Sequence, residues 1–98
     1  MNNVSNMYEN QAEIIKALGH KTRLMILHEI KDREICVCKF QEKAKVSMAT
    51  ISKHLSILKK ANLVVTRKEN NHIFYKLKYP CVLNFLDCIN QVLKRENK

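Results

Sequence analysis

The sequence predicts a mainly α-helical fold that carries one β-hairpin. Apolar residues recur at helical spacing in several segments between residues 9 and 61, and again between residues 81 and 94. Residues 63–77 instead alternate in the manner of two short strands. The 98 residues include one Gly and one Pro, which suits helices with few tight turns. A chain of this length forms one domain, so residues 1–98 are taken as a single unit.

The first two helices are expected over residues 9–18 and 21–31. Gly19 is a suitable end for the first of them. Residues 1–8 are polar, lack the apolar core of a signal peptide and are expected to be frayed. In both helices apolar residues fall on one face: Ala12, Ile15 and Leu18 in the first, and Leu24, Leu27 and Ile30 in the second.

A pair of short helices joined by a tight turn follows. Residues 36–44 form the first of the pair, and the second ends near Ala61. Ser47 is a good N-cap for this second helix, because its hydroxyl can accept a hydrogen bond from the first turn. Asn62 suits its C-terminal end. Its buried face is expected to consist of Ile51, Leu55 and Leu58.

The hairpin is expected over residues 63–68 and 73–77. Its polar tip contains Asn70 and Asn71, and asparagine tolerates turn geometry. Pro80 then opens a last helix over residues 81–94, since proline suits the first helical turn. The apolar positions of this helix are Val82, Phe85, Leu86, Ile89, Val92 and Leu93.

The chain is strongly basic, with 18 Lys and Arg against 9 Asp and Glu. Residues 46–78 contain one acidic residue, Glu69, and seven basic residues: Lys53, Lys59, Lys60, Arg67, Lys68, Lys76 and Lys78. A basic half of this kind favours a polyanionic partner, and a solvated surface is the alternative. No apolar run approaches the ~20 residues of a membrane span, so we expect a cytoplasmic protein without a membrane partner.

The order of these elements predicts a winged helix-turn-helix that binds double-stranded DNA. The second helix of such a pair can enter the major groove, and a basic hairpin can reach neighbouring phosphates or the minor groove. The expected DNA-binding residues of the helix are Ser47, Thr50, Ser52, Lys53 and His54, and those of the hairpin are Arg67, Lys68 and His72.

Several motifs in the right order resemble the ArsR/SmtB family of bacterial and archaeal repressors. Residues 47–55 (SMATISKHL) resemble its recognition helix, which commonly reads Ser-Gln-x-x-Val-Ser-x-His-Leu, and residues 61–64 (ANLV) resemble the exit from that helix. Residues 17–24 (ALGHKTRL) resemble its opening segment and residues 74–77 (FYKL) the end of its wing. The resemblance implies a transcriptional repressor that releases DNA when an effector binds.

We expect a homodimer, because the apolar faces of the first and last helices exceed what one small domain can cover. Residues 81–94 are then a dimerisation helix, and a two-fold dimer would read an inverted-repeat operator. The expected dimer contacts include Ile15, Leu18, Phe85, Leu86, Ile89 and Leu93.

Residues 34–38 (EICVC) resemble the cysteine box of the arsenic-responsive members of this family. The resemblance implies that Cys36 and Cys38 bind a thiophilic metalloid such as arsenite or antimonite, because thiolates are soft ligands. On one helix, side chains two residues apart point about 200° away from each other, so gripping one ion would strain the supporting helix. A cysteine that is only a small buried apolar residue is the alternative.

The best-known form of this box has a third cysteine where this chain has Gln41. Cys81 and Cys88 are candidate third ligands, from the same subunit or from its partner. Their spacing of seven places both on one face of the last helix, so they could meet across an antiparallel helix pair in a dimer. The alternative is that both are core residues of the dimer helix.

Three other functions are alternatives to a metalloid-responsive repressor. The first is a thiol-redox or reactive-sulfur sensor on the same fold, which would form a reversible disulfide among the four cysteines. The second is an enzyme, which is not expected because the sequence lacks a Gly-rich phosphate loop and a nucleophile elbow; a catalytic cofactor is not expected either. The third is a protein-binding adaptor, which would need an apolar outer face on the second helix of the pair.

Overall fold

The computed structural model describes residues 3–96, without the side chains of residues 3–5, 38, 41, 43, 95 and 96. Within that range the chain forms five helices and a three-stranded antiparallel sheet in the order β1-β3-β2. The elements are α1 (Asn3–Leu18), α2 (Lys21–Glu29), β1 (Ile35–Cys36), α3 (Val37–Ala44), α4 (Met48–Lys60), β2 (Val64–Glu69), β3 (His72–Leu77) and α5 (Cys81–Glu96). The predicted mainly α-helical fold with one hairpin is confirmed.

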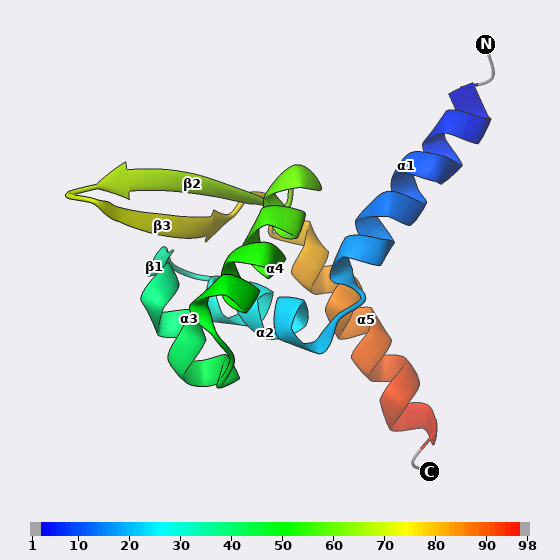
Figure 1. Cartoon of the computed structure of the whole chain (residues 1–98). Helices are drawn as coiled ribbons and strands as arrows, with labels where there is room; N and C mark the ends of the chain where they lie inside the picture. The colour runs from blue at the N-terminus through cyan, green and yellow to red at the C-terminus, as the bar shows by residue number, and fades with distance from the viewer. Residues whose placement is uncertain (1–2, 97–98) are drawn as a thin grey trace.

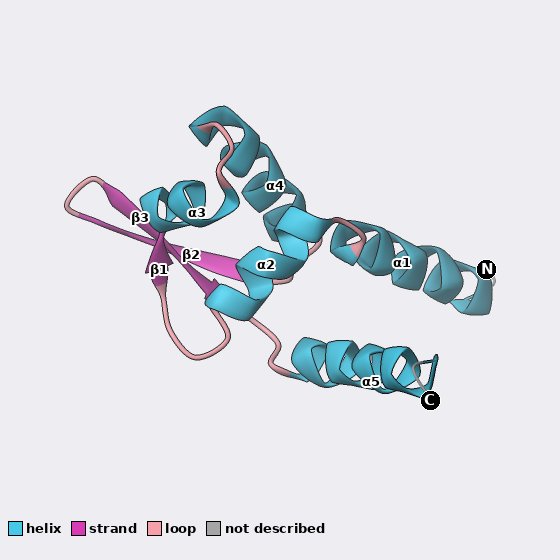
Figure 2. Cartoon of the chain, turned by 90° about the horizontal axis from the view of Figure 1, so that it is seen from below, coloured by secondary structure: helices cyan, strands magenta, loops and turns pink. Residues whose placement is uncertain are grey.

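Helices α2, α3 and α4 form the centre of the molecule (Figure 1). The β2–β3 hairpin projects from one side of this centre, and α1 and α5 extend from the other side and diverge (Figure 1). Seen from below, the hairpin and the two terminal helices again lie at opposite ends (Figure 2). The hairpin therefore occupies the position of a wing beside the α3–α4 pair.

The core lies between the three central helices and the base of the wing. Burial of apolar side chains drives this packing at roughly 25 cal/mol per Å². The fully buried side chains are Ile26, Leu27, Ile30, Phe40, Ile51, Leu55, Leu58 and Val64. Helix α1 adds Ala17 and Leu18 to this cluster, so most of its length lies outside the core of the protomer.

The ends of α4 are fixed by local hydrogen bonds, as the sequence predicts. Ser47 is its N-cap, with an extended backbone at φ −67° and ψ 157°. At the other end, Asn62 has φ 67°, its N–H donates to the Lys59 carbonyl, and the Leu63 N–H donates to the Leu58 carbonyl at 3.0 Å. These bonds form a Schellman motif, in which asparagine replaces the more usual glycine.

Three predicted boundaries were wrong. Residues 3–8 are helical, not frayed, because α1 begins at Asn3; residues 1–2 lie outside the described residues. Helix α2 ends at Glu29, two residues early, because Ile30 leaves helical geometry as its C-cap. Cys36 belongs to strand β1 and not to the following helix, because residues 35–36 pair with the free edge of β3.

Candidate nucleic-acid interface and thiol site

The first turn of α4 presents hydroxyl groups in a fixed arrangement. The Ser47 Oγ accepts a hydrogen bond from the Thr50 N–H at 3.2 Å and lies 3.0 Å from the Thr50 Oγ1. Both residues are exposed. The N-cap therefore fixes the conformation of the first turn of α4, the helix expected to enter the major groove.

Helix α4 has two distinct faces. Ile51, Leu55 and Leu58 are completely buried against the core. Ser52 and Lys53 are exposed on the opposite side, as is Thr50 in the first turn. The outward face thus carries the short hydrogen-bonding groups and the cation expected for reading DNA.

His54 is not on the outward face, and the expectation that it faces DNA was wrong. Its side chain is 8% exposed, and its Nδ1 lies 3.0 Å from an Nη1 of Arg23 on α2. The spacing of three residues from Ile51 places His54 on the buried side of the helix. Burial lowers the pKa of His54, and the nearby charges of His20, Arg23 and Lys53 lower it further.

Arg23 has a structural role that was not predicted from the sequence. Its Nε donates to the Ala17 carbonyl at 2.6 Å, at the C-terminal end of α1. The His20 ring, at the N-cap of α2, lies 4.3 Å from the His54 ring between centroids. Arg23 therefore ties α1 and α2 to α4, and His54 must accept its hydrogen bond as a neutral ring.

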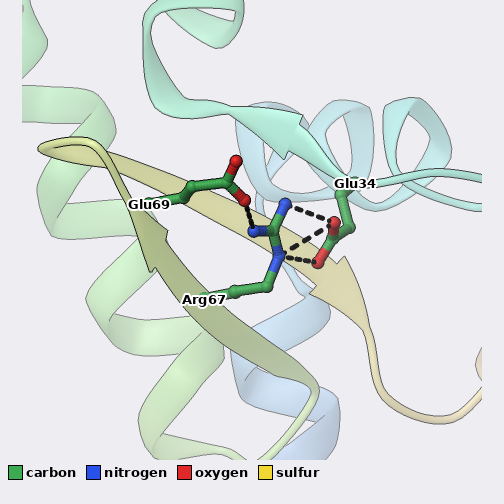
Figure 3. Close-up of polar contacts among 3 residues, drawn as sticks. All are labelled: Glu34, Arg67 and Glu69. Atoms are coloured by element: carbon green, nitrogen blue, oxygen red, sulfur yellow. Dashed lines mark hydrogen bonds and ion pairs between the residues drawn. The ribbon is translucent and has the colours of Figure 1, made fainter.

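The predicted cations of the wing differ in their surroundings. Lys68 is exposed on β2. Arg67 is bound by two carboxylates: its Nη2 lies 2.9 Å from the Glu34 Oε1, and its Nη1 pairs with Glu69 (Figure 3). Its guanidinium also lies 4.8 Å from the centre of the Phe74 ring. The hydrogen bonds from Arg67 lower the pKa of the Glu34 carboxyl and raise the pKa of Arg67.

The wing turn places His72 at the start of β3. The hairpin has a two-residue loop, Asn70-Asn71, and both residues have positive φ, 51° and 68°. Positive φ at both central residues is typical of the tight turns that connect hairpin strands. His72 is exposed, and its Nδ1 lies 3.9 Å from the Sγ of Cys36 on β1. The structure thus brings a predicted DNA-binding residue beside a predicted metalloid ligand.

The two cysteines of the predicted sensor lie on either side of the junction between β1 and α3. Cys36 is half-buried in the strand, and Cys38 lies in the first turn of the helix, with its side chain outside the described set. The expectation that both thiols project from one helix, about 200° apart, was therefore wrong. Among the described side chains, no three His, Cys, Asp or Glu residues lie close enough to hold a metal ion.

Cys81 and Cys88 are exposed on α5, and this helix lies away from β1 in both views (Figures 1 and 2). Cys81 lines a groove of about 480 Å³ between α1 and α5, together with Leu18 and Phe85. One protomer therefore does not bring either thiol to Cys36.

The terminal helices expose large apolar side chains. Of the expected dimer contacts, Ile15 is 55% exposed, and Phe85, Ile89 and Leu93 are 41–53% exposed. Leu18 and Leu86 are buried and lie beneath this surface. Three residues that were not named as dimer contacts are also exposed on these two helices: Met7, Tyr8 and Val92. None of the helices over residues 3–96 is long and apolar enough to span a membrane.

Comparison with known proteins places this architecture among transcription regulators. The model for the arsR family of bacterial regulatory proteins matches residues 20–66. A helix-turn-helix-type transcriptional regulator of Methanocaldococcus jannaschii is 51% identical over 69 residues, which cover 69% of this chain and 78% of that relative. An arsenical resistance operon repressor of Staphylococcus xylosus is 37% identical over 86 residues, which cover 88% of this chain and 79% of that relative. The crystal structure of NolR from Sinorhizobium fredii superposes with a TM-score of 0.84 at 27% identity, covering 94% of this chain and 92% of that one.

Proposed function

Because this chain belongs to the arsR family of bacterial regulatory proteins, we propose that it is a repressor that a thiophilic metalloid releases from its operator. The chain is a DNA-binding transcriptional regulator and not an enzyme. Its relatives and its structural neighbour are also transcriptional regulators. We also propose which residues contact DNA, that the protein is a homodimer and which effector it binds.

One observation carries the DNA-binding assignment: the outward face of α4 is polar and cationic, and an exposed basic wing lies beside it. Thr50, Ser52 and Lys53 face away from the core. We assign them, with Ser47, to the major groove, and Lys68 and His72 to the neighbouring phosphates or minor groove. Arg67 contributes less than Lys68, because two carboxylates already neutralise its charge.

The DNA assignment is tested by comparing one helix variant with one wing variant. Thr50→Ala should change the preferred operator sequence, because this side chain faces base edges. Lys68→Ala should weaken binding to all sequences and reduce the salt dependence by about one counterion. Lys31→Ala, an exposed lysine outside both elements, is the control and should bind as the wild type does. Indistinguishable loss patterns for Thr50→Ala and Lys68→Ala would contradict the assignment.

The homodimer is supported by the exposed apolar surfaces of α1 and α5. Ile15, Phe85, Ile89 and Leu93 are exposed and line one pocket between the two helices. An exposed apolar patch is a common mark of a protein interface. A two-fold dimer presents two copies of α4, which suits an inverted-repeat operator.

Two observations support a metalloid as the effector. Residues 34–38 resemble the cysteine box, and the chain is similar to an arsenical resistance operon repressor. The position of the thiols suggests how an ion would act. Strand β1 pairs with the wing strand β3, and α3 lies against α4. An ion that pulled Cys36 and Cys38 together would disturb both DNA-contacting elements, and only such a difference in affinity between two states can release DNA.

The remaining cysteines decide how the metalloid is coordinated. Loss of arsenite response in Cys81→Ser or Cys88→Ser would identify a third thiol from α5 of the partner subunit. An unchanged response in both would leave a two-sulfur site completed by solvent or a small thiol. A redox sensor behaves differently, because an oxidant alone would then release DNA and a reductant would restore binding. Release of DNA by an oxidant alone, together with no response to arsenite, would contradict the metalloid proposal.

A further inference from the structure

The first turn of α4 exposes apolar groups within a polar and cationic surface. Met48 and Ala49 are the first two residues of this helix, and both are exposed, Met48 by 37%. Ser47 before them, and Ser52 and Lys53 after them, are exposed as well. The two residues are therefore an apolar contact inside a surface whose charge suits DNA.

Helical geometry places both residues where α4 would meet a major groove. Ala49 precedes the buried Ile51 by two residues, so its side chain points about 200° away from that of Ile51, toward the side of Lys53. Met48 precedes the exposed Ser52 by four residues, so these two are neighbours along one flank of the helix. The N-terminal residues of a recognition helix are those that contact base edges.

The hydrogen-bonding side chains of this turn are partly committed to its N-cap. The Ser47 Oγ accepts a hydrogen bond from the Thr50 N–H at 3.2 Å and lies 3.0 Å from the Thr50 Oγ1. Residues 48–60 of α4 include no Asn, Gln or Arg. Asn and Gln identify adenine by paired hydrogen bonds, and Arg is the commonest partner of guanine. Helix α4 therefore lacks the side chains that read adenine in this way.

Thymine offers an apolar group that this turn can recognise. Of the four bases, thymine alone presents a C5-methyl group in the major groove, and apolar side chains such as alanine contact it. The unbranched Met48 side chain has three rotatable bonds, so it can adapt its shape to such a group. Removal of one methyl group from water changes affinity by about fourfold, and hence by about fifteenfold for two half-sites.

We propose that Met48 and Ala49 read a thymine in each half-site of the operator, by apolar contact with its 5-methyl group. The inference rests on the proposed function, because it requires α4 to enter the major groove. It adds the kind of base that the first turn of this helix selects. It also assigns specificity to two side chains that form no hydrogen bond with a base.

The test uses a duplex that the metal-free protein selects from a random library. Each symmetry-related pair of thymines is replaced in turn by uracil, which differs from thymine only in lacking the methyl group. Competition with the labelled parent duplex measures the relative affinities. The wild type should lose about fifteenfold in affinity at one pair of thymines and should bind the other substituted duplexes nearly as well as the parent.

The double variant Met48→Ser/Ala49→Ser removes the apolar contact and should bind the thymine and uracil duplexes equally at that pair. Met48→Leu keeps an apolar side chain and should retain most of the discrimination. Val65→Ser is the matched control, because Val65 is 39% exposed but lies on β2, and this variant should discriminate as the wild type does. Binding of each variant to random-sequence DNA at low salt, which depends on its cations, shows that the variant is folded.

The outcomes separate this inference from the proposed function. Equal affinity of the wild type for every thymine and uracil duplex would overturn the inference, as would full discrimination in Met48→Ser/Ala49→Ser. Both results leave α4 in the major groove, where its polar side chains would then read the operator. The placement of α4 fails separately, if Thr50→Ala and Lys68→Ala give the same pattern of loss.

Discussion

At the scale of single residues, His54 is fixed where the recognition helix α4 meets α2. Its ring accepts a hydrogen bond from Arg23 and lies against His20, so a proton on His54 would be placed among other cations. The folded protein therefore favours the neutral ring, in agreement with the lowered pKa. The geometry makes His54 a positioning residue for α4, not a DNA contact.

Stability should consequently fall as the pH falls. The unfolded chain has a His54 pKa near 6.5 and the folded chain a lower one, so the unfolded state binds more protons between these values. The stability that neutral His54 supplies is present above pH 6.5 and is lost as the pH drops through the folded pKa. His54→Gln should be less stable at pH 7.5, by about 1–3 kcal/mol for a disrupted buried hydrogen bond, and its urea unfolding should depend less on pH.

The control for this prediction is His28→Gln, since His28 is exposed on α2. Its unfolding should follow the pH dependence of the wild type. If the pH profiles of His54→Gln and the wild type superimposed, the assigned role of His54 would be wrong.

The residue scale also shows which site predictions could be made from the sequence. The exposed Thr50, Ser52 and Lys53 follow from helical spacing once Ile51 and Leu55 are placed in the core. The same spacing places His54 on the buried side, and a strict application of it would have corrected the prediction. The contact between Cys36 and His72 could not be predicted, because it joins residues 36 apart through a strand that has no periodic signal.

At the scale of elements, the wing depends on its two-residue turn. Asn70 and Asn71 both adopt left-handed backbone angles, which cost most residues about 1–2 kcal/mol each and cost glycine almost nothing. Asn71→Gly should therefore maintain or raise the free energy of unfolding, and Asn71→Val should lower it by about 1–2 kcal/mol. Urea unfolding measures both changes, and equal stabilities for the two variants would contradict the turn geometry.

Strand β1 and the first turns of α1 were not predicted, and both lack a periodic apolar pattern in the sequence. Strand β1 has only two residues, too few for an alternating pattern, and it exists because β3 offers it hydrogen bonds from a distant part of the chain. The first turns of α1 extend beyond the core of the protomer, so no apolar face marks them. Helices α4 and α5, by contrast, carry strong caps or long apolar faces and were predicted closely.

At the scale of the whole molecule, the exposed faces of α1 and α5 predict self-association. Phe85→Glu should place a charge in the proposed interface and convert the protein to a monomer at micromolar concentration. Phe85 is 45% exposed within the protomer, so the variant should still fold. Sedimentation equilibrium measures the change.

Ile73→Glu is the matched control for dimerisation, because Ile73 is 40% exposed but lies on the wing. This variant should remain dimeric. A wild-type protein that sediments as a monomer at micromolar concentration would contradict the proposed dimer.

In the proposed mechanism, the thiols at the β1–α3 junction control the affinity of α4 and the wing for DNA. The most direct measurement is fluorescence anisotropy of a labelled duplex, selected from a random library by the metal-free protein, during titration with arsenite in the presence of reductant. The wild type should release the duplex, and the double variant Cys36→Ser/Cys38→Ser should bind it equally well and retain it throughout the titration. Release of the duplex from the double variant on addition of arsenite would contradict the account.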